Sequence, residues 1–363
     1  MTAPTSIRVA WLISNHGWGH LSRSLVCLEA LLARGHHVAA VVGPEMAAAV
    51  ASALPAVTVV TGRLDRGYVF GAGGRGVDRE ASRPLFAEVL AGPEPALVEA
   101  LRAWSPQVVA ADATPWISTV AIALGAPSVL VSNFSWDDQF DAMYAPTPDV
   151  DRLHEVVART SLGLEMPLGP GLPLARTRRA VPLISRMPRG PVALDGLAGG
   201  EPFVAWAFGR TAPAAQPADA LRVIAAEARA RGLRLAVDAA VGAHAGLGAE
   251  VVPVPDDAYW PDLLAAARLV VTKAGYSSVA ESLRGHGYVL SAGITGLTEE
   301  RGMLAAIEAA RYGLTVPWDA PDFTERMAAS ARTLLDRPPR TPVTERGEVD
   351  VALALEALVA RPD

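Results

Sequence analysis

Two histidines and an arginine occur together in the stretch SNHGWGHLSRSL, residues 14–25. The stretch follows the apolar run IRVAWLI and precedes a helical pattern, so it lies where a strand ends and a helix begins. Gly17 and Gly19 allow positive φ and a close approach of the backbone to a ligand. His20 is a candidate base, since a histidine side chain can take a proton from a hydroxyl group. His20 therefore either acts as a general base or packs and caps the turn, and the residues alone leave both interpretations open.

His16 and Trp18 belong to the same turn, and Arg23 lies one helical turn further on. The N-terminus of the helix offers free N–H groups to an anion. Arg23 either holds a phosphate or a carboxylate or lies solvated on the surface, whereas a loop histidine such as His16 is more often structural than catalytic. The turn lacks the third glycine of the dinucleotide fingerprint and the Gly-Lys-Ser/Thr of the ATP-binding loop. A dinucleotide or ATP site is therefore disfavoured.

A second stretch with functional residue types is DDAYWPDLLAAARLVVTKAGYSSVAESL, residues 256–283. RLVVTKAG predicts a strand that ends in a turn, and YSSVAESL predicts the start of a helix. Small residues, hydroxyl groups and a helix N-terminus suit a diphosphate. Glu281 follows about one turn later, where its carboxylate either accepts bonds from two ribose hydroxyls or lies exposed. The candidate diphosphate-binding residues are Lys273, Ala274, Gly275, Tyr276, Ser277 and Ser278.

Further candidates follow other predicted strands. Glu299 and Glu300 open a helix in GLTEERGM, where the helix dipole alone favours acidic residues and where recognition of sugar hydroxyls is the functional alternative. AFGRTAP places Gly209 and Arg210 where they can contact phosphate. The remaining candidates, expected on the side of a second substrate, are Asp112 at the end of QVVAAD and Asn133, Trp136 and Asp137 in VSNFSWDD.

Apolar strand-like runs alternate with helical patterns along most of the chain, which predicts parallel sheets covered on both faces. The Pro/Gly-rich residues 166–200 interrupt this alternation and are the predicted linker. We therefore expect two doubly wound, Rossmann-like α/β domains, residues 1–165 and 201–340. Residues 341–363 are expected to form a C-terminal helix that can pack back on the first domain. Ligands bind beyond the carboxyl ends of such strands, so the site is expected in the cleft between the domains.

Composition limits the classes of protein to consider. A chain of 363 residues with 51% hydrophobic and 19% charged residues is expected to fold as more than one domain. The net charge of -6 disfavours nucleic acid as a partner, and one cysteine allows neither an intrachain disulfide nor a thiolate metal cage. The sequence shows no signal peptide and no apolar run long enough to span a membrane. We expect a cytoplasmic protein, and the sequence does not indicate its oligomeric state.

Four motifs, HGWGHLSR, SNFSWDD, DAYWPDLLAAA and AGYSSVAESL, occur in an order that resembles a known family. They look like the GT-B glycosyltransferases, most nearly the glycosyltransferase-like N-terminal region of plant L-arabinokinase. The kinase half of that enzyme is not expected here. The wider resemblance is to the bacterial cell-wall N-acetylglucosaminyl transferase and to a sugar-nucleotide hydrolase of pseudaminic acid synthesis. The GGTGGH run of the cell-wall enzyme is absent, so its type of acceptor does not carry over.

The resemblance implies an inverting, metal-independent transfer of a hexosyl group. The donor would be a nucleoside-diphosphate sugar, with UDP favoured over GDP or dTDP and no further cofactor. The acceptor would be a hydroxyl of a small molecule, in bacterial natural-product (antibiotic) biosynthesis. His20 would be the base, Gly275, Ser277, Ser278 and Glu281 would hold the nucleotide, and Glu299 and Glu300 would hold the donor sugar. The alternatives are a sugar-nucleotide hydrolase, a 2-epimerase and a non-catalytic sugar-nucleotide-binding protein.

Overall fold

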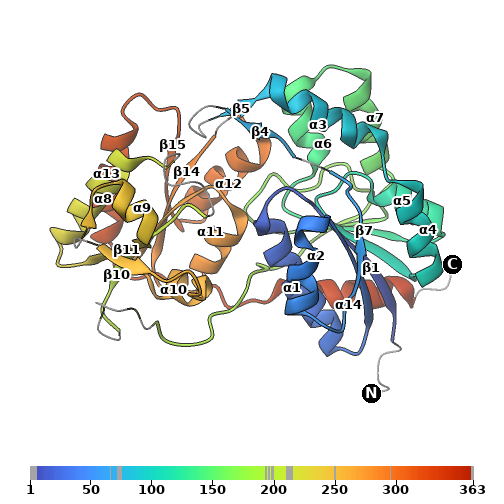
Figure 1. Ribbon diagram of the computed structural model, residues 1–363, viewed down its shortest axis with the longest axis horizontal. Coiled ribbons are helices and arrows are strands. Elements are labelled where there is room, and N and C mark those ends of the chain that lie inside the picture. Colours follow the sequence, from blue (N-terminus) through green and yellow to red (C-terminus); the bar gives the residue numbers. More distant parts are fainter. Residues whose placement is uncertain are drawn as a thin grey trace.

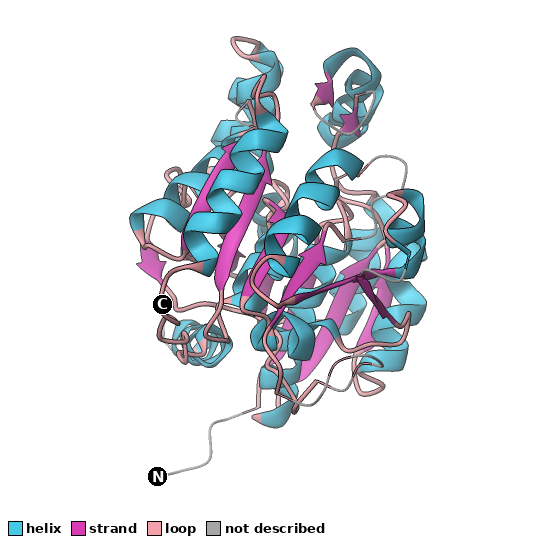
Figure 2. Ribbon diagram, turned by 90° about the vertical axis from the view of Figure 1, so that its left-hand side faces the viewer, coloured by secondary structure: helices cyan, strands magenta, loops and turns pink. Residues whose placement is uncertain are grey.

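Two parallel β-sheets, each flanked by helices, form the protein (Figure 1). A computed structural model describes residues 6–65, 67–71, 76–192, 194, 197, 200–209, 216–248, 251–294 and 296–360. Seen after a 90° turn, helices lie on both faces of the strands (Figure 2). The predicted fold class, two doubly wound α/β domains that face each other, is confirmed.

The first sheet has seven strands in the order β3-β2-β1-β6-β7-β8-β9, all parallel. The last strand, β9, lies inside the Pro/Gly-rich segment. In chain order the strands are β1 (Arg8–Ile13), β2 (His37–Val42), β3 (Thr58–Thr61), β6 (Val108–Asp112), β7 (Ser128–Ser132), β8 (Leu162–Glu165) and β9 (Arg178–Ala180). The helices of this half are α1 (Trp18–Ala33), α2 (Pro44–Ala53), α3 (Arg79–Ala91), α4 (Pro95–Trp104), α5 (Ile117–Leu124), α6 (Trp136–Tyr144) and α7 (Pro148–Val157).

The second sheet has six parallel strands in the order β12-β11-β10-β13-β14-β15. They are β10 (Phe203–Ala207), β11 (Arg234–Asp238), β12 (Val251–Val254), β13 (Leu269–Lys273), β14 (Tyr288–Gly293) and β15 (Gly313–Pro317). The accompanying helices are α8 (Ala218–Arg229), α9 (Ala239–His244), α10 (Trp260–Ala266), α11 (Tyr276–Ser282), α12 (Thr298–Ala309) and α13 (Phe323–Leu335). A short antiparallel pair, β4 (Val69–Phe70) and β5 (Val77–Asp78), lies outside both sheets.

The central strands are buried along their whole length because both of their faces are covered. Every residue of β6, β7, β10 and β14 is buried, which is the pattern of strands in a doubly covered parallel sheet. The carboxyl ends of β1, β6 and β7 lie side by side, since β6 pairs with both neighbours. The loops after these strands therefore meet at one edge of the first sheet, and this edge carries the site described below.

The C-terminal helix α14 (Gly347–Val359) returns to the first half of the molecule and packs against α1 (Figure 1). Val351 and Leu355 of α14 are fully buried in the first core. The carboxylate of Glu356 accepts two bonds from Arg34, at 2.6 and 2.8 Å, and lies 2.8 Å from Nε2 of His36. One carboxylate thus ties the end of the chain to the helix that carries His20. None of the described helices is both long and apolar enough to cross a membrane.

We expect Glu356→Ala to destabilise the protein by about 2 kcal/mol at neutral pH, because a largely buried carboxylate with charged partners is lost. The bond from Arg34 holds the pKa of Glu356 below its usual range. The difference is therefore present above about pH 4.5 and shrinks as the pH falls below it. Urea unfolding of both proteins measures it. The control is Glu99→Ala, which removes an exposed pair with Arg102 and should cost less than about 0.5 kcal/mol. Equal costs for the two variants would contradict a role of Glu356 in docking α14.

Candidate active site

The turn after β1 brings His20 into the first turn of α1. Gly17 caps this helix with φ of 82°, a conformation that favours glycine, and its amide donates to the carbonyl of Asn15 at 3.2 Å. The side chain of His20 is 7% exposed. His20 is therefore held at the carboxyl edge of the first sheet and is almost completely covered by the protein.

Asp112 lies beside His20 because of the strand pairing. It is the last residue of β6 and pairs with Ile13, the last residue of β1. The Oδ1 atom of Asp112 lies 3.2 Å from Nδ1 of His20. This is the arrangement of a histidine base whose second ring nitrogen is oriented by a carboxylate.

Arg23 lies one turn after His20 and is also buried, with 4% exposure. Its guanidinium holds both oxygens of Asp112, with Nε 2.7 Å from Oδ2 and Nη2 bonded to Oδ1. Burial alone would raise the pKa of Asp112, but the charge of Arg23 and the hydrogen bonds from its neighbours keep it at about 2. Asp112 is thus a carboxylate at neutral pH, and Arg23 is engaged inside the protein rather than solvated.

Asn133 and Gln139 of the first half bind the helix that carries Glu299. Asn133 accepts a bond from Nη1 of Arg23 at 2.8 Å and donates from Nδ2 to Oε1 of Glu299 at 3.3 Å. Oε1 of Gln139 accepts from the backbone N–H of Thr298 at 2.8 Å, which satisfies a free donor at the start of α12. Burial raises the pKa of Glu299, and the charges of His20 and Arg23 oppose this rise. Glu299 therefore faces the His20 cluster across the boundary between the two halves.

The start of α11 touches the start of α1. The hydroxyl of Ser277 donates to the carbonyl of Gly19 at 3.0 Å. Gly275 precedes α11, and Lys273 ends β13 with its ammonium 5.8 Å from the ring of Phe70. Burial lowers the pKa of Lys273, and Glu300 partly restores it. The predicted diphosphate-binding turn and the His20 turn thus lie in contact with each other.

Glu300 lies next to Glu299 but has a different partner. Its Oε2 accepts from the backbone N–H of Ile294 at 2.5 Å. Burial raises the pKa of Glu300 to about 7, against the effect of that bond. Lys273 ends β13, and Glu300 lies in the first turn of α12, which follows the neighbouring strand β14. This edge of the second sheet can therefore offer both a carboxyl and an ammonium group to a ligand.

Glu281 is buried at 2% exposure and is bound by a residue of the Pro/Gly-rich segment. Arg186 donates to its Oε1 at 2.7 Å and to its Oε2 at 3.1 Å. Tyr259 lies beside this pair, with its hydroxyl donating to the carbonyl of Met187 at 3.2 Å. Both oxygens of Glu281 are therefore taken by Arg186, and a ribose that binds Glu281 must share it with Arg186 or displace it.

Three of the predicted site residues are buried, two of them inside the first domain and one between the two halves. Trp136 is fully buried, donates to Oγ of Ser14 at 3.0 Å and packs edge-on against His16. Asp137 is fully buried beside Ser135. Tyr276 is buried under the guanidinium of Arg23, 5.0 Å from ring centre to Cζ. These side chains shape the site from behind, because the helices that carry them point those residues into the core.

The other candidates are placed as follows. Gly209 lies just after β10 with φ of 66°, and Arg210 lies outside the described residues. Ala274 is buried, Ser278 is partly exposed, and Trp18 is 41% exposed at the start of α1. Within the described ranges no group of three or more His, Cys, Asp and Glu side chains is arranged to hold a metal ion.

Sequence reasoning missed the roles of Arg186 and Gln139. Arg186 lies in a Pro/Gly-rich segment with no periodic pattern, and Gln139 lies inside a helix, so neither has a local signal. Both act on partners more than 90 residues away in the chain. Such pairings are set by the packing of the two halves, and a local sequence motif does not contain them.

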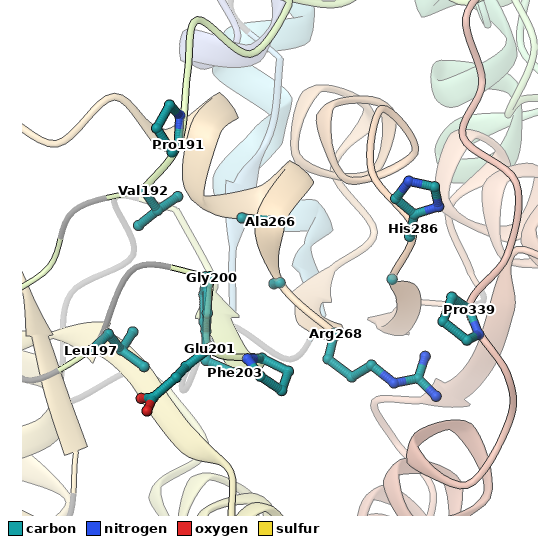
Figure 3. Close-up of a pocket in the computed structure, with 13 residues that line it drawn as sticks. Pro191, Val192, Leu197, Gly200, Glu201, Phe203, Ala266, Arg268, His286 and Pro339 are labelled. Carbon is teal, nitrogen blue, oxygen red and sulfur yellow. The ribbon is translucent and has the colours of Figure 1, made fainter.

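A cavity of about 330 Å³ lies on the opposite edge of the second sheet (Figure 3). Phe203 begins β10, Arg268 precedes β13, and His286 precedes β14, so the cavity lies at the amino ends of the strands. Ligands of doubly wound sheets bind at the carboxyl ends. We therefore place the candidate site at the His20 cluster, although the contact between Ser277 and Gly19 closes that region.

Comparison with known proteins agrees with this architecture. No protein-family model matches the chain. The chain is 27% identical over 288 residues to L-arabinokinase of Arabidopsis thaliana, which covers 76% of this chain. The chain spans only 27% of the length of that curated relative. The predicted resemblance to this protein is thus confirmed, while the resemblance to the cell-wall enzyme stays a prediction.

Solved structures match the chain over nearly its whole length. The calicheamicin glycosyltransferase CalG4 superposes with a TM-score of 0.65 at 15% identity, over 98% of this chain and 99% of CalG4. UGT89C1 of Arabidopsis thaliana, complexed with UDP-L-rhamnose, superposes with a TM-score of 0.63 at 14% identity, over 97% and 93% of the two chains. The protein therefore has the GT-B glycosyltransferase fold, as the motifs predicted.

Proposed function

We propose that the protein is a glycosyltransferase that moves a sugar from a nucleoside-diphosphate sugar to a hydroxyl of a small molecule. The observation that carries this proposal is the buried pair of His20 and Asp112 at the carboxyl edge of the first sheet, facing Glu299 across the cleft. A non-catalytic binding protein needs no such base. The GT-B fold supports the same interpretation, as an analogy of fold.

In the proposed mechanism His20 takes the proton of the acceptor hydroxyl while that oxygen attacks the anomeric carbon. The bond from the anomeric carbon to the diphosphate oxygen breaks in the same step, so the configuration inverts. Asp112 stabilises the imidazolium that forms, because it is ionised and lies 3.2 Å from Nδ1. The turn of Gly275 and Ser277, with the nearby Lys273, receives the negative charge of the leaving diphosphate. No step needs a metal ion.

We propose that Glu299 and Glu300 bind hydroxyls of the donor sugar and that Glu281 binds the ribose. A carboxyl group with a pKa of about 7, such as that of Glu300, can either donate or accept a hydrogen bond at neutral pH. UDP is the favoured nucleotide, with GDP or dTDP as alternatives. The complex of UGT89C1 with UDP-L-rhamnose supports this choice.

For the acceptor we propose an apolar small molecule, such as an intermediate of bacterial natural-product biosynthesis. Trp18, two residues before His20 in the chain, and Phe70 of β4 are each 41% exposed and offer apolar surface to a ligand. UGT89C1 has been crystallised with quercetin, and CalG4 is a calicheamicin glycosyltransferase, which supports an acceptor of this kind.

Nucleotide binding is the first test. A nucleoside diphosphate at about a hundredfold its Kd should stabilise the protein by about 2.7 kcal/mol. We expect a thermal shift with UDP that does not need Mg²⁺ and that is lost in Glu281→Gln. Glu325→Gln, an exposed position on α13, is the control and should keep the shift. If UDP, GDP and dTDP all leave the melting temperature unchanged, the assignment of the α11 turn to the nucleotide is wrong.

Transfer and hydrolysis are separated by one assay. The protein is incubated with a UDP-sugar, with and without a hydroxylated aromatic acceptor, and free sugar and glycoside are quantified. We expect UDP release to depend on the acceptor. Release of free sugar at the same rate without acceptor would instead identify a sugar-nucleotide hydrolase.

A further inference from the structure

Nδ1 of His20 lies next to one hydrogen-bond acceptor and one hydrogen-bond donor, which favour different protonation states of this atom. Oδ1 of Asp112 lies 3.2 Å away and can only accept a hydrogen bond, and Nη2 of Arg23 lies 2.9 Å away and can only donate one. The two hydrogens of Nη2 are shared among three acceptors, which are Nδ1, Oδ1 of Asp112 and Oγ of Ser132. A proton on Nδ1 would place two donors 2.9 Å apart. The geometry at the shorter distance fits an unprotonated Nδ1 that accepts from Arg23, with the proton on Nε2.

This protonation state matters for the proposed reaction. A neutral imidazole with its proton on Nε2 cannot take a second proton at that atom from an acceptor hydroxyl. The basic form needs the proton on Nδ1, donated to Asp112 as in known base–carboxylate pairs. Arg23 opposes this form twice, because it faces Nδ1 and because it holds both oxygens of Asp112.

We propose that Arg23 is a positioning residue that sets the tautomer of His20. In the ligand-free protein it keeps the imidazole in the form with the proton on Nε2. His20 becomes a base when the guanidinium moves away from Nδ1, so that Nδ1 carries the proton and donates it to Asp112 in a hydrogen bond. The inference rests on the proposed role of His20 and deepens it.

The contacts of Arg23 connect this change to the donor side of the cleft. Its Nη1 donates to Asn133, and Asn133 donates to Glu299, the carboxylate proposed to bind the donor sugar. Its guanidinium also covers the ring of Tyr276 at the start of α11. A sugar hydroxyl that bonds to Glu299 competes with the amide of Asn133. Binding of the donor thus removes one hydrogen bond of Asn133, which is one of the partners of Arg23 besides Asp112, and couples the tautomer of His20 to the donor.

Few charged groups face His20, so the effect of Arg23 can be separated from that of the others. Arg23 lies on its own helix, Asp112 ends β6, Asp65 follows β3, and Glu299 opens α12. Asp65 accepts from Ser14 and from the backbone of Asn15 and does not bond to His20. Arg23 and Asp112 are therefore the groups in contact with Nδ1.

The tautomer can be observed directly by NMR of the protein labelled with ¹⁵N-histidine. The protein has seven histidines, and the signal absent from His20→Gln assigns His20. In the ligand-free protein we expect the ring shifts of a neutral imidazole protonated at Nε2. With UDP-sugar bound, the pattern should change to protonation at Nδ1. A proton on Nδ1 in the ligand-free protein would overturn the inference, and this measurement needs no turnover.

A second test uses the pH dependence of kcat/KM. Arg23→Met removes a cation next to His20 and frees Asp112, so the pKa of the acid limb should rise by about one unit. Arg23→Lys keeps the charge and should shift it less. Arg284→Met is the matched control, because Arg284 is equally buried, at 6% exposure, but binds Ser185 and backbone carbonyls away from the dyad. It should lower stability without moving the acid limb.

The outcomes distinguish the proposed role of Arg23 from the proposed glycosyltransferase activity. An acid limb that stays in place in both Arg23 variants would overturn the inference about Arg23. If Arg23→Met does not fold, Arg23→Lys and the NMR spectrum of the unmodified protein still decide it. If the unmodified protein transfers no sugar while its His20 shows the expected tautomer, the proposed function fails and the assignment of Arg23 to the tautomer stands.

Discussion

His20→Gln is expected to lower kcat for sugar transfer by about 10³-fold, while UDP still binds. General-base catalysis typically contributes 10²- to 10⁴-fold, and here a single imidazole occupies the base position. Glutamine keeps a polar side chain of similar length but cannot accept a proton near neutral pH. Transfer is measured by product formation with UDP-sugar and acceptor, and binding is measured by thermal shift.

The comparison that makes this result specific is His16→Gln. His16 is four residues earlier and packs against the rings of Tyr68 and Trp136, 4.5 and 5.0 Å between centroids. The substitution His16→Gln should therefore lower the free energy of unfolding more than it lowers kcat. A His20→Gln variant with undiminished kcat would show that His20 is not the base. A larger loss of kcat in His16→Gln than in His20→Gln would show that His16, and not His20, is the base.

Asp112→Ala is expected to destabilise the protein by about 3–5 kcal/mol, because it leaves the guanidinium of Arg23 buried without its carboxylate. The double variant Asp112→Leu with Arg23→Met removes both charges and should cost clearly less than the single change. Urea unfolding of the unmodified protein, Asp112→Leu, Arg23→Met and the double variant gives the coupling free energy. A double variant as unstable as the sum of both single changes would mean that the pair is not coupled.

The contribution of Asp112 to the free energy of unfolding should be lost over a defined range of acid pH. The pKa of Asp112 is about 2 in the folded protein and about 3.9 in an unfolded chain. The folded state therefore gains from this ionised group above about pH 4 and loses that gain as the pH falls toward 2. The difference in stability between the unmodified protein and Asp112→Ala should shrink over this interval. A difference that is constant down to pH 2 would contradict the low pKa.

The architecture could be predicted from the sequence because its signals are local. Continuous apolar runs such as those of β1 and β6 predict buried parallel strands, and the periodic leucines after Gly19 predict α1. His20 could be singled out for the same reason: a glycine turn between a strand and a helix places a side chain at the carboxyl edge of the sheet. Asp112 and Asn133 could also be predicted at this edge, as the residues that end or follow neighbouring strands.

The sequence by itself thus determined the two-domain α/β architecture, the His20 turn and the helix starts that face it, since each depends on neighbours in the chain. Only the tertiary structure decided which side chains are partners. Asp112 meets His20 and Arg23 from about 90 residues away, Glu281 is held by Arg186, and Trp136 turns into the core. These outcomes depend on strand order and on how the two halves pack. A buried charge needs a partner of opposite charge close in space, and that partner can lie far away in the chain.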